Sequence, residues 1–238
     1  MKKSVGIFSL TSCEGCEFEM LNHYEKFNEL LRYFDIKNFR LGQEDSWPGP
    51  FDIAIVEGNP EGEEQIKLIK HVRKISGTVV IIGACAHLGG IQSERNRLPR
   101  KFIDKDPIKT VSDYIKVDYI IPGCPIRHEE LFAALMDIYW GKIFTLPDLP
   151  VCAECRQNEN VCHLRNHKPC LGPITRGGCN SICINKGEAC LGCRGTINQP
   201  NIAKLKEALG SMITEDEVEN LLTFYGDYEK EHNKFVIK

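Results

Sequence analysis

Short apolar segments alternate with longer amphipathic segments over residues 1–145, a pattern typical of a sheet covered by helices on both faces. The apolar segments are rich in Ile and Val and are bounded by Gly or polar residues, as expected of buried parallel strands. We predict strands at residues 4–10, 52–56, 78–82 and 117–121, with a weaker one at 36–41. The pattern therefore predicts an α/β fold, an open, flavodoxin-like doubly wound parallel sheet.

Between these segments, apolar residues recur at helical spacing and predict helices that pack on the sheet. The first stripe consists of Met20, Tyr24, Phe27, Leu31 and Phe34. Two further stripes consist of Leu68, Val72 and Ile75, and of Leu131, Leu135 and Ile138. Gly141 can end the helix of the last stripe. Asp106 before Pro107 predicts the N-cap and first turn of another helix, which would carry Ile108, Val111 and Ile115.

The pattern changes at the Pro-rich segment 146–150, which predicts a boundary between two domains, 1–145 and 146–238. Residues 152–193 have almost no aliphatic periodicity, so something other than a hydrophobic core must hold them together. Further on, Thr214 and Glu217 match a capping box, and an apolar face follows them at Val218, Leu221, Leu222 and Tyr225. We therefore predict a loop-rich second domain with C-terminal helices.

Charge and hydropathy exclude several classes of partner. The chain has 238 residues and a net charge of −3, which gives no sign of nucleic-acid binding. Its one basic cluster, Arg95, Arg97, Arg100 and Lys101, is expected to be a solvated loop. No stretch approaches the roughly 18 apolar residues of a membrane span, and the apolar run 5–10 is shorter than the roughly 7 residues of a signal-peptide core. We expect a cytoplasmic protein with reduced thiols and no membrane span.

Eight of the twelve cysteines fall within the loop-rich segment: Cys152, Cys155, Cys162, Cys170, Cys179, Cys183, Cys190 and Cys193. Disulfides are not expected in a reducing compartment. The two Cys-x-x-Cys pairs could form one zinc site, but the four cysteines between them have irregular spacings. Iron–sulfur clusters take four thiolates each and accept such spacings in loop-rich chain. The spacing favours two clusters over zinc and leaves zinc as the alternative.

The other four cysteines each follow a predicted strand. Cys13 and Cys16 follow the first strand, Cys85 follows strand 78–82, and Cys124 follows strand 117–121. Ligands of open parallel sheets bind beyond the carboxyl ends of the strands. We therefore expect a four-thiolate site at this edge. Cys13-x-x-Cys16 alone also fits a thioredoxin-like redox pair, but that interpretation leaves Cys85 and Cys124 unexplained.

Other motifs carry less information. The glycine-rich segment 83–90 follows a strand but lacks the order of a dinucleotide fingerprint, and no Walker-type lysine loop is present. Its glycines are expected to let the backbone approach a cluster. His87 lies two residues past Cys85, and a packing or surface role is expected for it. No Ser/His/Asp grouping or carboxylate pair indicates a hydrolytic site.

With these residues in place, residues 1–230 resemble the small, electron-transferring subunit of nickel–iron hydrogenases, of the cytosolic kind related to sulfhydrogenase and methyl-viologen-reducing enzymes. The resemblance is carried by four motifs: Leu-Thr-Ser-Cys13-Glu-Gly-Cys16, Gly-Ala-Cys85-Ala-His-Leu-Gly-Gly-Ile-Gln, Gly-Cys124-Pro, and the block from Pro-Val-Cys152 to Cys193-Arg-Gly. It implies an oxidoreductase subunit without a nickel site of its own. It also implies three 4Fe–4S clusters, which would carry electrons between the Ni–Fe site of a separate large subunit and a soluble-acceptor module.

The same resemblance implies how the cysteines are shared among the clusters, and it implies no catalytic residue on this chain. The proximal set would be Cys13, Cys16, Cys85 and Cys124, the distal set Cys152, Cys155, Cys162 and Cys170, and the medial set Cys179, Cys183, Cys190 and Cys193.

The chain departs from the periplasmic relatives at four points. Cys152 stands where many of them have a histidine, which implies an all-thiolate distal site. Cys183 stands where they have a proline and a three-iron cluster, which implies a four-iron medial cluster. Ile126 replaces a second proline after Cys124. A twin-arginine export signal is absent, in agreement with the expected cytoplasmic location.

Two other classes of function remain open at this point. A complex I type quinone-reducing subunit shares the flavodoxin-like half and the proximal site but would lack the eight-cysteine segment. A zinc-stabilised scaffold would use the cysteines as structural ligands, and its colourless protein would differ from a brown iron–sulfur protein. The further electron-transfer partner, which could be a flavin and NAD(P) module, a deazaflavin module or a disulfide reductase, is not indicated by the sequence.

Overall fold

The computed structural model describes residues 1–44, 47–99, 101 and 106–226. The chain divides into two compact units, Met1–Thr145 and Leu146–Lys238. Among the described residues, no helix is long and apolar enough to cross a membrane.

Unit 1 is built on a five-stranded sheet in which every neighbouring pair of strands is parallel. The strands are β1 (Lys3–Ser9), β2 (Phe34–Phe39), β3 (Phe51–Glu57), β4 (Ser76–Ile82) and β5 (Tyr119–Ile121). Their order, β2-β1-β3-β4-β5, is that of a flavodoxin-like sheet. The predicted α/β class and the doubly wound sheet are therefore confirmed, and the weak strand proves to be the edge strand β2.

Burial on both faces explains why these segments form strands. Along β3, Ile53 and Ile55 pack in one apolar cluster, while Ala54 and Val56 pack in another on the opposite face. All four side chains are at most 1% exposed. Burying one such aliphatic side chain stabilises the fold by about 1.5–3 kcal/mol.

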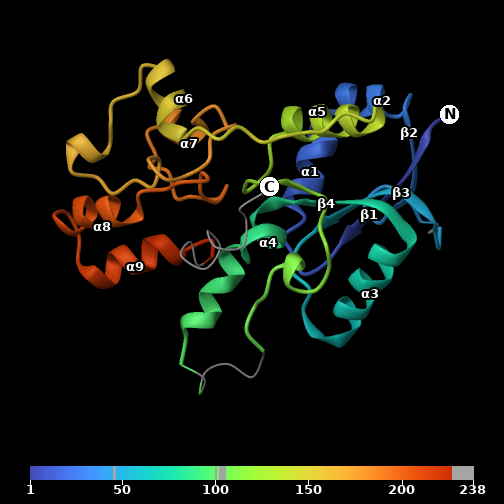
Figure 1. The fold of residues 1–238 in the computed structure, drawn as a ribbon, viewed down its shortest axis with the longest axis horizontal. Coiled ribbons are helices and arrows are strands. Elements are labelled where there is room, and N and C mark those ends of the chain that lie inside the picture. Colours follow the sequence, from blue (N-terminus) through green and yellow to red (C-terminus); the bar gives the residue numbers. More distant parts are fainter. Residues whose placement is uncertain (45–46, 100, 102–105, 227–238) are drawn as a thin grey trace. The chain divides into compact units, whose positions relative to one another are not determined.

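Helices cover the two faces unequally (Figure 1). The helices of unit 1 are α1 (Gly15–Asn22), α2 (Tyr24–Leu30), α3 (Gly62–Ile75), α4 (Gly83–Leu88) and α5 (His128–Tyr139), with the 3-10 helices η1 (Ile91–Arg97) and η3 (Val111–Asp113). Residues from α1, α2 and α5 share a cluster with Ile53, whereas α3 contributes Ile69 and Val72 to the cluster of Val56. The described residues between β2 and β3 contain no helix, so part of the second face is left without a helical cover.

Four details of the predicted helices are wrong. The stripe from Met20 to Phe34 is divided between α1 and α2 at His23, whose φ and ψ of −106° and 55° are not helical; Tyr24 is 65% exposed and Phe34 begins β2. Leu68 is exposed, and its neighbour Ile69 is buried in its place.

The predicted helix after Asp106 is also absent. The chain forms only the short η3, because Thr110 and Asp113 build a capping box with each other after the start that was predicted at Pro107. Ile108 and Val111 are nevertheless buried, as expected of the apolar stripe. The helix with Leu131, Leu135 and Ile138 is confirmed as α5, and Gly141 follows it with a φ of +69°.

Unit 2 is rich in loops. Its helices are α6 (Val151–Gln157), η4 (Leu164–Asn166), α7 (Ile182–Asn185), α8 (Ile202–Gly210) and α9 (Glu215–Thr223), and its described residues contain isolated bridges but no strand. The predicted capping box is confirmed, since Thr214 and Glu217 hydrogen-bond each other at the start of α9. The apolar cluster beside α6 and α7 is small, and its buried members are Val151, Cys155, Cys170, Ile184 and Cys190.

Candidate functional site

The four cysteines of unit 1 gather beyond the carboxyl ends of the strands. Cys13 follows β1, Cys16 lies in α1, Cys85 lies in α4 directly after β4, and Cys124 follows β5. Their thiols interact electrostatically: Cys85 with Cys124 and Cys13, and Cys16 with Cys124 and Cys85. Cys16 is buried, Cys85 is half-buried, and Cys13 and Cys124 are exposed.

Burial governs the acidity of these thiols. Burial, helped by the neighbouring thiols of Cys124 and Cys13, raises the pKa of Cys85 to about 12. Burial and the charge of Glu57 likewise raise the pKa of Cys16 far above its ordinary value. Thiols in such a setting stay protonated at neutral pH unless a cation offsets their negative charge. Iron centres supply that positive charge, so this donor set fits an iron–sulfur cluster.

A buried carboxylate positions the helix turn that carries Cys16. Glu57 ends β3, is 2% exposed, and accepts hydrogen bonds from the backbone N–H groups of Cys16 at 3.2 Å and Glu17 at 3.0 Å. These groups belong to the first turn of α1, which has no side-chain cap of its own, and an acidic group is favourable at a helix N-terminus. Glu57 therefore fixes the start of the helix that carries Cys16. It was not predicted from the sequence, although a carboxylate ending an apolar strand was a visible signal.

Glu17 is a second buried carboxyl group at this edge. Its side chain is fully buried and accepts a hydrogen bond from the Ser9 hydroxyl at 2.5 Å. Burial raises the pKa of Glu17 to about 7; the Ser9 hydrogen bond lowers it and the charge of Glu57 raises it. This residue was not predicted from the sequence either.

Two glycines make room for the thiols. A Cβ atom on Gly83 would lie 2.6 Å from the Sγ of Cys16, and one on Gly90 would lie 2.6 Å from the Sγ of Cys85. Both glycines have a positive φ, which other residues rarely adopt. The prediction that glycines of this segment let the backbone approach the site agrees with these distances. Ile126, the departure from a second proline, is 1% exposed and packs in the core.

The first four cysteines of unit 2 also gather. Cys152 and Cys155 lie in α6, and Cys162 and Cys170 lie in the following loops. Burial, helped by the thiols of Cys170, Cys155 and Cys162, raises the pKa of Cys152 to about 11. Cys155 interacts in the same way with Cys170 and Cys162. Gly172 lies against this group, since a Cβ there would stand 3.3 Å from the Sγ of Cys152.

Two of the last four cysteines, Cys183 and Cys190, interact with a cysteine of the preceding set. Cys190 interacts with Cys193, and its backbone N–H donates to the Sγ of Cys170 at 3.4 Å. Cys183 also interacts with Cys170. Cys183 and Cys190 of the predicted medial set thus both interact with Cys170 of the predicted distal set.

Cys179 lies beside two charged groups that were not predicted from the sequence. Burial raises the pKa of its thiol; Arg194 lowers it and Glu154 raises it. Arg194 is 1% exposed, and its Nε donates to the carbonyl oxygens of Arg176 and Gly177. Glu154 accepts hydrogen bonds from the backbone N–H groups of Gly178 and Ser181 and lies 3.8 Å from the Cys179 sulfur.

The spacing of the thiols bears on the choice between zinc and clusters. Over the described residues, which include all twelve cysteines, no three cysteine sulfurs lie within 4.8 Å of one another. Four sulfurs bound to one zinc ion at about 2.3 Å would lie about 3.8 Å apart. An iron–sulfur cluster holds each thiolate on a different iron atom and therefore needs a wider set. The sulfurs of the described cysteines are therefore not gathered as closely as four ligands of a single zinc ion would be.

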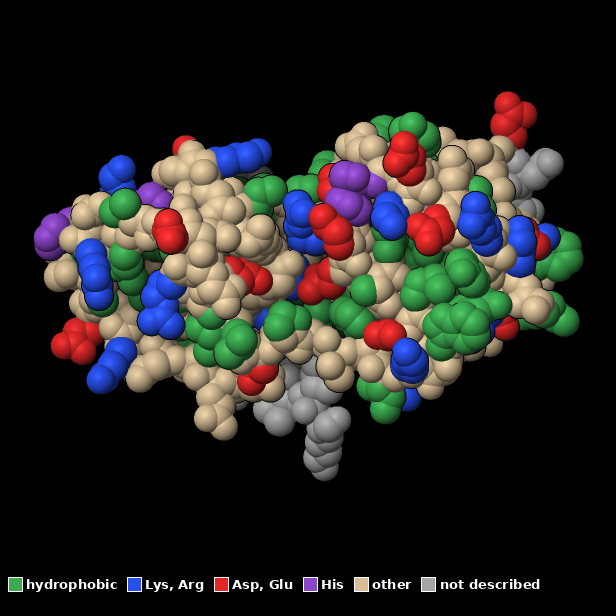
Figure 2. All heavy atoms as spheres, turned by 90° about the horizontal axis from the view of Figure 1, so that it is seen from above, with side chains coloured by type: hydrophobic (Ala, Val, Ile, Leu, Met, Phe, Trp, Pro, Cys, Tyr) green, Lys and Arg blue, Asp and Glu red, His purple; other side chains and the backbone are tan. Residues whose placement is uncertain are grey.

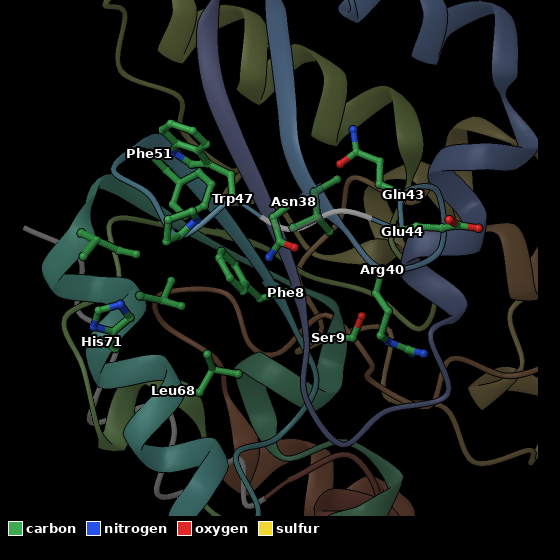
Figure 3. A pocket seen from close by; sticks show the side chains of 14 residues that line it. Phe8, Ser9, Asn38, Arg40, Gln43, Glu44, Trp47, Phe51, Leu68 and His71 are labelled. Atoms are coloured by element: carbon green, nitrogen blue, oxygen red, sulfur yellow. The ribbon is translucent and has the colours of Figure 1, made fainter.

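A separate pocket of about 460 Å³ lies where no helix covers the sheet (Figure 3). Residues of β1, β2, β3, α3 and the β2–β3 connection line it, among them Phe8, Trp47, Phe51, Leu68 and His71. None of its described lining residues is a cysteine, so the pocket is distinct from the thiol sites.

Comparison with known proteins defines the class of this chain. Residues 13–138 match the family described as NADH ubiquinone oxidoreductase, 20 Kd subunit. A chain of the Ni-Fe-Se hydrogenase from Desulfomicrobium baculatum superposes with a TM-score of 0.59 at 16% identity, covering 95% of this chain and 99% of that one. A chain of an NAD+-reducing [NiFe]-hydrogenase superposes with a TM-score of 0.56 at 23% identity, over 62% of this chain and 96% of that one. The architecture is that of a cysteine-rich oxidoreductase subunit.

Proteins of similar sequence identify the kind of oxidoreductase subunit more closely. Sulfhydrogenase 2 subunit delta of Pyrococcus furiosus is 34% identical over 225 residues, covering 90% of this chain and 95% of the relative. A subunit of the F420-non-reducing hydrogenase vhu of Methanocaldococcus jannaschii is 29% identical over 80% of this chain and 81% of the relative. These similarities extend beyond residues 13–138 into the eight-cysteine segment. The chain belongs to the 20 Kd subunit family, within its branch of hydrogenase electron-transfer subunits.

Proposed function

We propose that this chain is the electron-transferring small subunit of a cytoplasmic nickel–iron hydrogenase. It would connect the Ni–Fe site of a large subunit with a soluble-acceptor module. The observation that supports this most strongly is the convergence of four thiols at the carboxyl edge of a flavodoxin-like sheet. A second unit with eight further cysteines follows in the same chain.

Each part of the chain has a role in this proposal. Cys13, Cys16, Cys85 and Cys124 hold the proximal cluster, and Cys152, Cys155, Cys162 and Cys170 hold the distal one. Cys179, Cys183, Cys190 and Cys193 hold the medial cluster. When bound, 4Fe–4S clusters supply sites that accept and release single electrons.

The protein groups around the thiols tune these sites. Glu57 holds the first turn of α1 in place through the N–H groups of Cys16 and Glu17. Gly83 and Gly90 leave space beside the sulfurs. Arg194 adds a buried positive charge beside Cys179, and charge close to a cluster shifts its reduction potential.

Metal analysis of anaerobically purified protein tests the proposal. Three four-iron clusters correspond to about twelve iron atoms and about twelve labile sulfides per chain. About two zinc atoms per chain would overturn the cluster assignment in unit 2. About eleven iron atoms with a three-iron EPR signal, in fully reconstituted protein, would overturn the role of Cys183.

Activity measurements test whether hydrogen is activated by a separate large subunit and not by this chain. The chain alone is expected to take up no hydrogen, because all twelve cysteines are assigned to clusters and none is left to bind a catalytic nickel. Hydrogen uptake by the isolated chain would contradict the proposal. Copurification with a nickel-containing subunit that restores uptake is the expected result.

A further inference from the structure

Three side chains of kinds that bind metals, two histidines and a glutamate, converge in unit 1 away from the cysteines. Figure 2 shows histidine side chains in purple. Glu19 lies in α1, His23 lies at the junction of α1 and α2, and His128 is the first residue of α5. One carboxylate oxygen, Oε1 of Glu19, lies 3.4 Å from Nε2 of His23 and 3.3 Å from Nδ1 of His128. The three ligand atoms all lie within 4.8 Å of one another.

The local fold brings these groups together. Glu19 and His23 are four residues apart, so they project from the same side of α1. His128 is 109 residues from Glu19 in sequence and is 8% exposed. Its ring packs edge-on against Phe132, with ring centroids 5.8 Å apart. Glu19 is therefore held by the helix and His128 by packing. His23 is 40% exposed and remains accessible from solvent.

The distances match those of a bound transition metal. With metal–ligand bonds of about 2.0–2.1 Å, two ligand atoms at adjacent tetrahedral positions lie about 3.3 Å apart. Both measured separations from Glu19 have this length. Over the part of the chain that the structure describes, this is the one group of three ligand atoms spaced so closely.

The chemistry of the donors indicates which ion fits. Two imidazole nitrogens and one carboxylate oxygen suit zinc and similar divalent transition metals, whereas calcium and magnesium prefer oxygen ligands. The rings of His23 and His128 are stacked, with centroids 3.2 Å apart and an angle of 17° between them. Metal binding would turn the rings from this parallel arrangement until both nitrogens face the ion.

We propose that Glu19, His23 and His128 form a binding site for one divalent transition-metal ion, best matched by zinc. Glu129 lies beside the site: its Oε1 pairs with Arg127 at 2.8 Å, and its Oε2 lies 3.3 Å from Nδ1 of His128. The remaining position on the ion would be open to Glu129 or to water. The ion links α1, which carries Cys16, to α5, which begins four residues after Cys124. It thereby braces two segments that flank the thiols of unit 1. The site does not depend on the function proposed above.

Zinc titration of the cluster-loaded full chain tests this site. The protein carries a purification tag without histidine, is first treated with a chelator, and then competes for zinc with a chromogenic indicator. We expect one zinc ion per chain, and at least about tenfold weaker binding in His23→Gln and in Glu19→Gln. Matched controls are His71→Gln, an exposed histidine on α3, and Glu25→Gln, an exposed carboxylate on α2. Both controls should bind zinc like the wild type.

Two results would overturn the proposal: no zinc bound by the wild type, or equal binding by the site and control variants. X-ray absorption at the zinc edge of the wild-type protein gives a readout that needs no variant. The expected shell contains nitrogen and oxygen at about 2.0–2.1 Å, whereas sulfur at about 2.3 Å would assign the zinc to cysteines. Iron content, measured on the same samples, reports on the clusters separately.

Discussion

Gly90 lies so close to Cys85 that a Cβ atom on its backbone would stand 2.6 Å from the Cys85 sulfur and 2.9 Å from its Cα. The lack of a side chain at position 90 is therefore part of the geometry around this thiol. Gly62 offers a comparison within the same unit, because its φ is also positive, at +73°, but nothing lies within 4 Å of its added Cβ.

Gly90→Ala is expected to lose the cluster held by Cys85, because the methyl group displaces the thiol. Iron content should fall by about one third, that is by one cluster of three. Gly62→Ala should keep all its iron. Alanine at the positive φ of position 62 should cost about 1–2 kcal/mol of stability. Gly90→Ala should cost more, because its φ of 63° and ψ of −166° are adopted almost only by glycine and the added Cβ also meets the backbone of Cys85. Denaturant titration will measure both losses. Full iron content in Gly90→Ala would show that the thiol is not a ligand.

Cys152→His tests the distal assignment. Imidazole is a competent ligand that raises the potential of an iron–sulfur centre. The variant of the assembled enzyme should keep about twelve irons and reduce its physiological acceptor more slowly. Hydrogen–deuterium exchange at the nickel site should stay near the wild-type rate, because it needs no long-range electron transfer.

Cys16→Ala is the companion variant for the proximal assignment. It should disrupt the proximal cluster, stop acceptor reduction and weaken association with the large subunit. Both variants are compared by iron analysis, isotope exchange and acceptor assays. If Cys152→His abolished isotope exchange while Cys16→Ala spared the acceptor reaction, the proximal and distal sets would be assigned wrongly.

Arg194→Gln removes the buried positive charge beside Cys179. Without this charge, the reduced state of the cluster bound by Cys179 is less stabilised, so its reduction potential should fall. The exposed Arg165 provides a control, because solvent screens its charge. Potentials are measured by EPR-monitored redox titration. An Arg194→Gln potential equal to that of Arg165→Gln would rule out this electrostatic role.

The capping box of α9 gives a prediction about pH. Hydrogen bonds from the backbone N–H and hydroxyl of Thr214 lower the pKa of Glu217 below its usual 4.5. Because the folded pKa is the lower one, the stabilisation is present above pH 4.5 and is lost as the pH falls through the folded pKa. Amide exchange of residues 215–223, corrected for intrinsic rates, should therefore show less protection in acid. Glu217→Gln, which cannot ionise, should show no such change in protection between neutral and acid pH.

Periodicity and local capping were enough to predict much of unit 1 and the last helix. The alternation of Ile53, Ala54 and Ile55 between two buried faces is visible in the sequence, and so is the pairing of Thr214 with Glu217. The division of the first helix at His23 is not visible, because the apolar spacing continues to Phe34. Tertiary structure overrides the spacing there, since Phe34 pairs with Lys3 as the first residue of β2.

The thiol sites were predictable to different degrees. Cys85 and Cys124 each follow a strand, and parallel strands end at the same edge of a sheet, so their common location could be predicted from the sequence. By contrast, the capping of α1 by Glu57 joins residues 41 positions apart, and the burial of Arg194 depends on carbonyl groups of a distant loop. The boundary between the last two cysteine sets also depends on loop conformation, because Cys183 and Cys190 both contact Cys170.

In unit 2, three of the five buried residues in the apolar cluster beside α6 and α7 are cysteines: Cys155, Cys170 and Cys190. The side chains that fill this interior are therefore the same ones that are proposed to bind iron. A newly synthesised chain can form the sheet of unit 1 from aliphatic residues alone. If the second unit binds the clusters proposed above, we expect its interior to be complete only once iron and sulfide are supplied. Cofactor supply would then set the time at which a newly made subunit becomes resistant to proteases.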